Sequence, residues 1–425
     1  MTKKYYLATL GCPKNEIDSE ALEADLRAAG LALAENSDCA DLIVVNSCGF
    51  INNAKVETIH TVLELHQDRK PGSVMVLCGC LPARYNLSRS LDEVDIFLPW
   101  DKHHELIPIL QEIGWSVGKK ADEFRRLAPC EPFAYLRISE GCDNRCAYCA
   151  IPDIRGPFRS RNSSDIIGEA EFLSQNGAKE LILIGQDTTL YGRNAAEEIS
   201  LPILMRKLSG IEACEWIRLM YAHPAHLTNE LIETMANLNK VVRYIDLPLQ
   251  HISDRILKLM NRKVTGKTIE AVIDKLRRNI PGIALRTTFI VGFPGETDSE
   301  FGELLDFMEA VEFDNVGAFK YSPEDGTQAY KLPGRVKDAV VEERYLTLLD
   351  IQNMISRKKL EARLGNRDKV LLHHIGQDGR GMARAHFQAP EVDGQVIIEN
   401  CLGRPGEFVD IVYKRTDAYD LYASQ

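Results

Sequence analysis

The chain has 425 residues, which predicts two or three domains, and its 45% hydrophobic and 27% charged residues are typical of an ordinary globular protein. It carries no amino-terminal apolar segment with a cleavage site and no apolar run of the ~18 residues that span a membrane, so we expect a cytoplasmic protein without a membrane partner. A net charge of −11 argues for a basic partner rather than nucleic acid, and 11 cysteines in a reducing compartment indicate metal or catalytic use rather than disulfides.

The first segment predicts a parallel sheet whose strands each end in a cysteine. Apolar strands are expected at residues 4–12, 41–50 and 73–81, and amphipathic helices at 15–30 and 52–67. This strand–helix–strand repetition produces a parallel α/β sheet. The carboxyl ends of parallel strands share one edge, so the strand-end cysteines are expected to lie along it: Cys12, Cys48, and Cys78 or Cys80.

A longer strand–helix series follows a loose segment at 115–133, which we interpret as a linker. Its strands are expected at residues 133–139, 179–187, 216–222, 244–251, 284–296 and 315–322. About six such units indicate a full or partial (β/α) barrel, with functional residues at the carboxyl ends of the strands. A helix at 337–362 then leads into short strands separated by glycine turns, which predict a small carboxyl-terminal β-barrel.

Three cysteines follow the first strand of the predicted barrel at the spacing C-x3-C-x2-C, namely Cys142, Cys146 and Cys149. Structural zinc sites use four ligands, whereas this loop offers three and the next cysteine is the distant Cys214. A [4Fe–4S] cluster held by three thiolates leaves one iron without a protein ligand, where a substrate or cofactor can bind. Three thiolates at this spacing can therefore hold a metal or an iron–sulfur cluster, and the alternative of another class is a non-catalytic zinc or redox protein.

The loop resembles the signature of radical S-adenosylmethionine enzymes, including the aromatic residue before its last cysteine. The resemblance implies that the open iron binds S-adenosylmethionine, whose reductive cleavage gives a radical that abstracts hydrogen, so no residue is assigned as a general acid or base. The second strand ends in Gly-Gln-Asp where the family usually has Gly-Gly-Glu. The cofactor-binding residues that this resemblance implies are Tyr148, Gly185, Gln186, Asp187, Asp246, Gln250, Gly292 and Gly295.

The segments around Cys12, Cys48 and Cys80 resemble the methylthiotransferases, and this resemblance covers essentially the whole chain. It implies a second [4Fe–4S] cluster on these cysteines, with Cys80 preferred over Cys78 because it follows a glycine at the strand end. One S-adenosylmethionine would methylate sulfur held there, and a second would activate a substrate C–H bond. The implied domains are a methylthiotransferase domain at 1–118, a radical core at 130–362 and a TRAM β-barrel at 363–425.

Two branches of that family offer different substrates. One modifies an adenosine in transfer RNA, and the other modifies the β-carbon of an aspartate in small-subunit ribosomal protein twelve. The motif GCPKN at 11–15 resembles the ribosomal-protein branch, because the tRNA branch has Gln-Met in place of Pro-Lys. Glu324 and Asp325, where a tRNA enzyme has Arg-Pro, and the segment 389–394 resemble the same branch.

The charge of the last domain also favours the ribosomal-protein branch, because residues 366–425 hold 7 Lys and Arg against 9 Asp and Glu. A domain that grips RNA phosphates should be basic, so direct RNA binding is not expected. We expect modification of the ribosomal-protein aspartate, with tRNA as the alternative substrate. The implied partners are ribosomal protein twelve, free or within the ribosomal subunit, an electron donor and a sulfur donor. Arg155, Arg159 and Arg161 after the cluster loop are left open between cofactor or substrate contact and a structural role.

Overall fold

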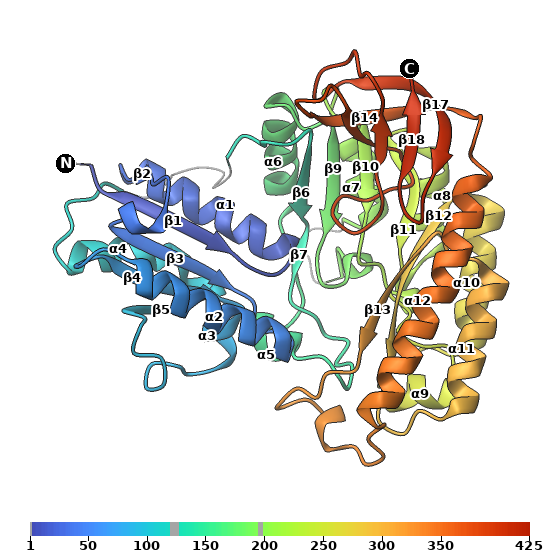
Figure 1. Cartoon of the computed structure of the whole chain (residues 1–425), viewed down its shortest axis with the longest axis horizontal. Helices are drawn as coiled ribbons and strands as arrows, with labels where there is room; N and C mark the ends of the chain where they lie inside the picture. Colours follow the sequence, from blue (N-terminus) through green and yellow to red (C-terminus); the bar gives the residue numbers. More distant parts are fainter. Residues whose placement is uncertain (1, 120–126, 194–198) are drawn as a thin grey trace.

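The computed structural model describes residues 2–119, 127–193 and 199–425, which form three parts along the chain (Figure 1). Residues 120–126, within the predicted linker, lie outside the described residues. In the described ranges, no helix has both the length and the apolar character needed to cross a membrane. A parallel α/β sheet, a partial barrel and a closed small β-barrel follow one another, which confirms the predicted fold class.

The amino-terminal part is a five-stranded parallel sheet with helices on both faces (Figure 1). Its elements are β1 (Lys4–Thr9), α1 (Pro13–Ala28), β2 (Ala32–Leu33), η1 (Ser37–Cys39), β3 (Leu42–Ser47), α2 (Asn52–Asp68), β4 (Val74–Gly79), α3 (Cys80–Arg84), β5 (Ile96–Pro99), η2 (Trp100–Glu105) and α4 (Leu106–Glu112). The strand order is β2-β1-β3-β4-β5, and the central strand β3 is buried along its whole length, as expected for a strand covered on both faces. Because Thr9 pairs with Asn46 and Asn46 with Cys78, the central strands end at one edge.

The central part is a six-stranded parallel sheet that does not close, so the predicted barrel is a partial one. Its elements are β6 (Phe133–Arg137), β7 (Ser139–Glu140), α5 (Ile151–Arg155), β8 (Arg159–Ser160), α6 (Ser163–Gln175), β9 (Glu180–Ile184), η3 (Thr188–Leu190), α7 (Leu201–Ser209), β10 (Trp216–Leu219), η4 (Pro224–His226), α8 (Asn229–Asn237), β11 (Val241–Asp246), α9 (Asp254–Leu259), α10 (Gly266–Asn279), β12 (Ala284–Val291), α11 (Asp298–Val311), β13 (Asn315–Lys320), η5 (Ala329–Lys331) and α12 (Asp338–Glu361). The order is β13-β12-β11-β10-β9-β6, and the helices cover the outer face. Helix α11 begins at a capping box between Thr297 and Glu300, which satisfies backbone donors of its first turn.

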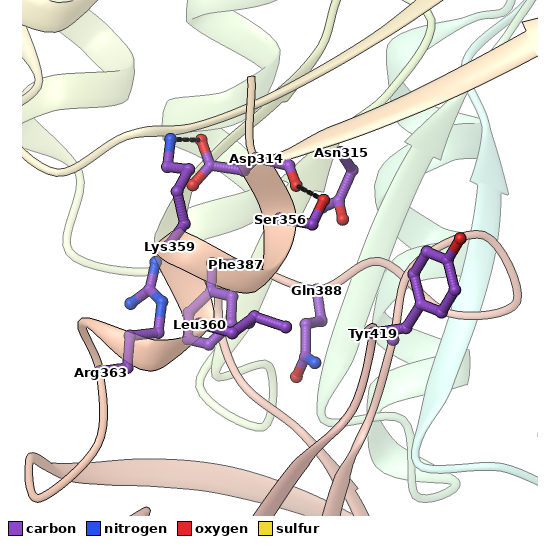
Figure 2. Close-up of a pocket in the computed structure, with 10 residues that line it drawn as sticks. Asp314, Asn315, Ser356, Lys359, Leu360, Arg363, Phe387, Gln388 and Tyr419 are labelled. Atoms are coloured by element: carbon purple, nitrogen blue, oxygen red, sulfur yellow. Dashed lines mark hydrogen bonds and ion pairs between the residues drawn. The ribbon is translucent and has the colours of Figure 1, made fainter. Parts of the chain in front are cut away.

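The last part is a closed barrel of five strands in the order β14-β15-β16-β18-β17. Its strands are β14 (Arg367–Ile375), β15 (Gly381–Arg384), β16 (Val396–Ile398), β17 (Phe408–Thr416) and β18 (Leu421–Ser424). One hydrophobic cluster joins this barrel to the sheet face that the helices leave free, including Tyr135 and Tyr244 of the sheet and Val370 of the barrel. Figure 2 shows the end of α12 at this contact, where Lys359 forms an ion pair of 2.9 Å with Asp314 beside barrel residue Phe387.

His373 of β14 is held neutral at the contact between the small barrel and the central sheet. Its Nε2 accepts a hydrogen bond of 3.0 Å from Arg384 Nε, and its ring lies 5.4 Å from the ring of Phe133. Burial, and then the charge of Arg384, lower the pKa of His373 to about 3, although the Glu131 carboxylate lies 3.7 Å away. Protonation of His373 would remove the Nε2 acceptor of this hydrogen bond and place a second positive charge beside Arg384.

The depressed pKa of His373 predicts that the folded chain loses stability as the pH falls from 6.5 towards 3. In this window the unfolded chain binds a proton that the folded chain excludes, so unfolding is favoured by about 2 kcal/mol between pH 6.5 and 5 from this residue alone. Chemical denaturation of the His373→Gln variant should show a shallower pH dependence than the parent. A substitution without a titrating group gives the control: Met382→Leu, at an exposed position of the neighbouring strand β15, should leave the slope unchanged. Equal slopes for all three proteins would contradict this account.

Glu324, in the loop after β13, joins the central part to the amino-terminal part. It is 2% exposed, and its carboxylate lies 2.9 Å from both Lys55 Nζ and Arg84 Nη1 and accepts a hydrogen bond of 2.7 Å from the backbone N–H of Asn52. Burial would raise the pKa of Glu324, but the hydrogen bonds from Ser322, Lys55 and Arg84 lower it overall. The residue that distinguished the two family branches in the sequence is thus a contact between domains.

Loss of this carboxylate should loosen the docking of the amino-terminal part. Glu324→Gln removes the only carboxylate that pairs with Lys55 and Arg84 in the described residues, so we expect destabilisation on the order of 3 kcal/mol and faster amide hydrogen exchange in α2 and α3. Asp325→Asn changes the exposed neighbour, whose contact with Arg84 is through the backbone carbonyl, and should leave exchange unchanged. Identical exchange in the two variants would show that Glu324 does not hold the domains together.

Candidate active site

Cys12, Cys48 and Cys80 lie together at the carboxyl edge of the amino-terminal sheet. Gly11 has φ +106°, and a side chain there would come within 3.2 Å of Cys48 Sγ, so the backbone of the first motif lies directly against the second cysteine. Cys80 begins α3, and its Sγ lies 3.6 Å from Oδ1 of Asn15, a residue of α1. Segments far apart in the sequence therefore bring the three thiols to one place.

Cys78 points away from these thiols into a hydrophobic cluster that includes Leu22 and Leu106. The alternation of side chains along β4 ends at Gly79, whose φ of +98° turns the chain into α3 before Cys80. This turn separates two cysteines that a continuous strand would place on one side. The structure thus groups Cys80, rather than Cys78, with Cys12 and Cys48.

Cys142, Cys146 and Cys149 lie in the loop between β7 and α5. The loop is fixed to its surroundings, because the N–H of Ala147 donates to the carbonyl of Met260 at 2.8 Å and the Ala147 carbonyl accepts from Ala329 at 2.7 Å. Gly141, at the start of the loop, has φ +73°, and a side chain there would lie 2.1 Å from the carbonyl oxygen of Pro157. A glycine is therefore required where this loop leaves β7.

Both groups of cysteines line one cavity of about 420 Å³ between the amino-terminal and central parts. We call Cys12, Cys48 and Cys80 the auxiliary trio and Cys142, Cys146 and Cys149 the radical trio. Aromatic and cationic side chains also line this cavity, among them Tyr148, Tyr221, Arg262 and Phe319. A ligand bound at either trio would therefore face the space in front of the other.

The donor set fits two iron–sulfur clusters. All 11 cysteines are free thiols, and burial raises the pKa of Cys80 and Cys142 to about 11 and that of Cys149 further. Such thiols hold a proton at neutral pH unless a nearby cation stabilises the thiolate, and metal ions do this. Each trio offers three sulfurs, and the described lining contains no further cysteine, so a four-iron cluster at either place would keep one iron without a cysteine ligand.

Three of the expected cofactor-binding residues line the cavity, namely Tyr148, Gln186 and Gln250. The amide Nε2 of Gln186 donates to Glu140 at 2.7 Å, while its Oε1 is buried with no hydrogen-bond partner in the described structure, which is a feature of a group that awaits a ligand. Gln250, in the loop after β11, has φ +75°, a strained conformation for a residue with a side chain. These positions suit contacts to a bound cofactor.

The remaining five expected residues lie outside the lining. A side chain at Gly185 would come within 2.4 Å of Ser139 Oγ, and one at Gly292 would meet Val341 of α12, so both glycines allow close packing of neighbouring elements. Gly295 donates its N–H to Gly334 at 2.7 Å. Asp246 pairs with Arg286 at 3.0 Å, and Asp187 belongs to the network described next. A role for these five in cofactor binding stays a prediction.

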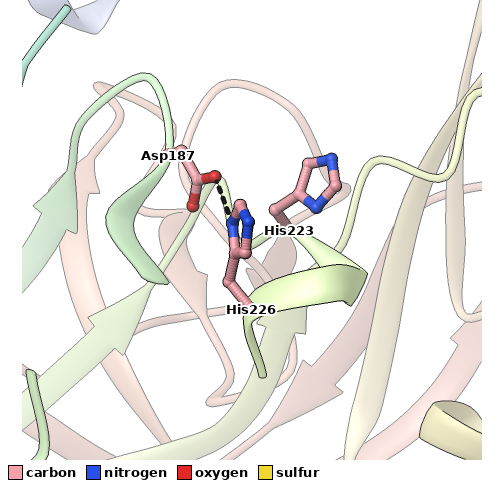
Figure 3. Close-up of side chains that lie close together, drawn as sticks. All are labelled: Asp187, His223 and His226. Atoms are coloured by element: carbon pink, nitrogen blue, oxygen red, sulfur yellow. Dashed lines mark hydrogen bonds and ion pairs between the residues drawn. The ribbon is translucent and has the colours of Figure 1, made fainter. Parts of the chain in front are cut away.

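Asp187 organises a polar network that includes His226 and His223, which lie close to it in Figure 3. Its carboxylate accepts hydrogen bonds from Asn144 at 2.7 Å, from the backbone and hydroxyl of Thr189, and from His226 at 2.8 Å, with His223 stacked on His226. Although the ligand atoms of Asp187, His223 and His226 lie within 4.8 Å of one another, these donors already satisfy the carboxylate, so we interpret the group as a hydrogen-bond network. Since Asn144 lies within the radical loop, Asp187 helps to hold that loop.

Two arginines contact the cysteines of the site, and no sequence motif indicated these contacts. Arg262, after α9, donates to the carbonyl of Pro248 at 2.7 Å and to Tyr148 Oη at 3.2 Å, and its Nη1 lies 3.7 Å from Cys146 Sγ. Arg155, whose role the sequence left open, is buried beside the auxiliary trio and reaches Cys80 Sγ at 3.4 Å. Both depend on contacts between segments distant in the chain, which residue spacing alone does not reveal.

Family models and solved structures match the three parts of the chain. The models described as Uncharacterized protein family UPF0004, Radical SAM superfamily and TRAM domain match residues 4–99, 136–308 and 364–425. The structure of the radical S-adenosylmethionine methyltransferase TsrM from Kitasatospora setae, with cobalamin and a [4Fe-4S] cluster bound, aligns with a TM-score of 0.57 at 14% identity, covering 77% of each chain. That similarity concerns the fold alone.

Curated relatives match over nearly their full length. The ribosomal protein uS12 methylthiotransferase RimO of Acetivibrio thermocellus is 41% identical, covering 99% of this chain and 98% of the relative. The RimO proteins of Syntrophobacter fumaroxidans and Aquifex aeolicus are 42% and 40% identical, covering 100% and 98% of this chain and 98% and 96% of the relatives. With two cysteine trios on one cavity and this similarity along the whole chain, the protein belongs to the RimO family of radical S-adenosylmethionine methylthiotransferases.

Proposed function

We propose that this protein transfers a methylthio group to the β-carbon of an aspartate in ribosomal protein uS12. The observation that carries the proposal is the single cavity lined by both cysteine trios, because sulfur insertion requires a sulfur-bearing site and a C–H-activating site to act on the same carbon. The relatives named uS12 methylthiotransferases support the choice of substrate.

The six cysteines and three cavity residues would hold the cofactors. Cys12, Cys48 and Cys80 would bind the auxiliary [4Fe–4S] cluster, and Cys142, Cys146 and Cys149 the radical-site cluster. Tyr148, Gln186 and Gln250 would contact S-adenosylmethionine, with Gln186 presenting its unpaired amide oxygen as an acceptor. When bound, the clusters and S-adenosylmethionine would supply electron transfer, C–H activation and the methyl group, and the sulfur of the methylthio group would come from the sulfur donor. We further propose that the domains span residues 1–118, 130–362 and 363–425.

The remaining cavity residues orient these groups and limit water. Lys14 is 9% exposed, and its Nζ lies 3.1 Å from the centre of the Tyr221 ring, so its charge is held on an aromatic face at the cavity wall. Arg262 fixes Tyr148 beside the radical trio through the hydrogen bond to its hydroxyl. The lining is largely apolar beyond these groups, which favours reaction away from bulk water.

The proposed setting is the cytoplasm, where an electron donor and a sulfur donor would serve the two sites. The carboxyl-terminal barrel, with its excess of acidic over basic residues, suits a basic protein better than an RNA backbone. Transfer RNA is the second candidate substrate because the related branch of the family modifies it. The family membership argues against the alternative from another class, a zinc or redox protein without catalytic activity.

The substrate assignment predicts a selective product. Incubation of the reconstituted protein with S-adenosylmethionine, a reductant and sulfide, in the presence of both uS12 and tRNA, should add one methylthio group to an aspartate of uS12 and none to tRNA. Tandem mass spectrometry of the peptide and nucleoside digests measures both products. A methylthio adduct on adenosine together with unmodified uS12 would show that transfer RNA, and not uS12, is the substrate.

The cluster assignment predicts iron content that follows individual cysteines. The reconstituted parent should hold about eight irons per chain, and Cys12→Ala, Cys80→Ala and Cys142→Ala about four each, while Cys78→Ala keeps about eight because Cys78 lies in the hydrophobic core. Cys12→Ala should still cleave S-adenosylmethionine, whereas Cys142→Ala should not. Iron and sulfide analysis decides between Cys80 and Cys78 as the third ligand of the auxiliary cluster. Loss of a cluster in Cys78→Ala with retention in Cys80→Ala would reverse this assignment. Zinc in place of iron would favour the non-catalytic alternative.

A further inference from the structure

Arg155 links the loop of the radical trio to a sulfur of the auxiliary trio. It ends α5, six residues after Cys149, and is 2% exposed. Its Nη2 donates to Asn15 Oδ1 at 2.8 Å and lies 3.4 Å from Cys80 Sγ, so a residue of the central part contacts a cysteine of the amino-terminal part. Its guanidinium lies 4.6 Å from the centre of the Trp100 ring, which covers it.

We propose that Arg155 is a positioning residue that raises the reduction potential of the auxiliary cluster through its contact with Cys80 Sγ. This inference rests on the two-cluster assignment under the proposed function. Reduction adds one negative charge to a cluster, and a cationic donor at a ligand sulfur stabilises the reduced form more than the oxidised form. The contact is shielded from water, so the effect of the charge is greater than it would be at the surface.

Two carboxylates hold the guanidinium in place. Asp18 Oδ2 lies 2.8 Å and Glu140 Oε2 lies 3.4 Å from Arg155 Nη1, and Arg137 pairs with the same two residues at 2.6 and 3.0 Å. The group of two arginines and two acids is balanced in charge, so Arg155 is oriented without a large excess of charge. Its second terminal nitrogen is then free to face Asn15 and Cys80.

The radical trio has a comparable arginine that supplies a matched control. Arg262 Nη1 lies 3.7 Å from Cys146 Sγ, and Arg262 is 7% exposed. It belongs to the other side of the cavity and makes its remaining contacts with Tyr148 and Pro248. Substitution of Arg262 should therefore change the potential of the radical-site cluster and leave the auxiliary cluster unchanged.

The test isolates the auxiliary cluster in the full-length chain. A background with Cys142, Cys146 and Cys149 all changed to alanine is reconstituted with iron and sulfide, and the midpoint potential is measured by redox titration followed by electron paramagnetic resonance. In this background Arg155→Met should lower the ratio of reduced to oxidised cluster about tenfold at a fixed potential, a shift of about 59 mV for a one-electron couple. Arg262→Met should leave the ratio unchanged.

Two further variants keep the test decisive if Arg155→Met folds or loads poorly. Arg155→Lys retains the charge without the planar contact and should lower the ratio by less than tenfold. Arg155→Met/Asp18→Asn preserves the net charge of the group and should still lower the potential because the donor to Cys80 is lost. A loaded cluster whose potential is unchanged in these variants overturns the role of Arg155, whereas failure of the background itself to load iron would count against the two-cluster assignment.

Discussion

The site depends on the docking of the amino-terminal sheet against the loop of the radical trio. Each trio is built by one domain, and a shared cavity exists only where the two domains meet. Buried ion pairs hold that contact at two places, through Arg155 with Asp18 beside the auxiliary trio and through Glu324 with Arg84 at the other end of α3. Because such pairs offset much of their attraction by desolvation, we expect them to fix the orientation of the domains more than to add net stability.

The carboxyl-terminal barrel is also part of this framework. It covers the sheet face that the helices leave free, and its Asp393 lies 3.4 Å from Arg286, which in turn pairs with Asp246 at the end of β11. A residue expected near the cofactor is therefore connected to the last domain through one arginine. The barrel is thus fixed to the strand end that carries Asp246.

Local patterns in the sequence were sufficient to predict much of this structure. The fold class followed from alternating strands and helices, and the radical trio followed from cysteines within one short loop. The sequence favours Cys80 over Cys78 because Cys80 follows a glycine and matches the family motif, and the structure adds the physical reason, since the positive φ of Gly79 turns the chain after the strand. The contacts of Arg262, Arg155 and Glu324 could not be predicted, because each pairs with residues brought close only by tertiary folding.

The central claim is that the two cysteine trios line one and the same cavity. Crystals of the chain reconstituted with iron and sulfide, measured at the iron absorption edge, test it directly through the anomalous difference map. The account predicts two separate iron peaks in the same cavity, one against Cys12, Cys48 and Cys80 and one against Cys142, Cys146 and Cys149. A single peak, or a second peak outside this cavity, would contradict it.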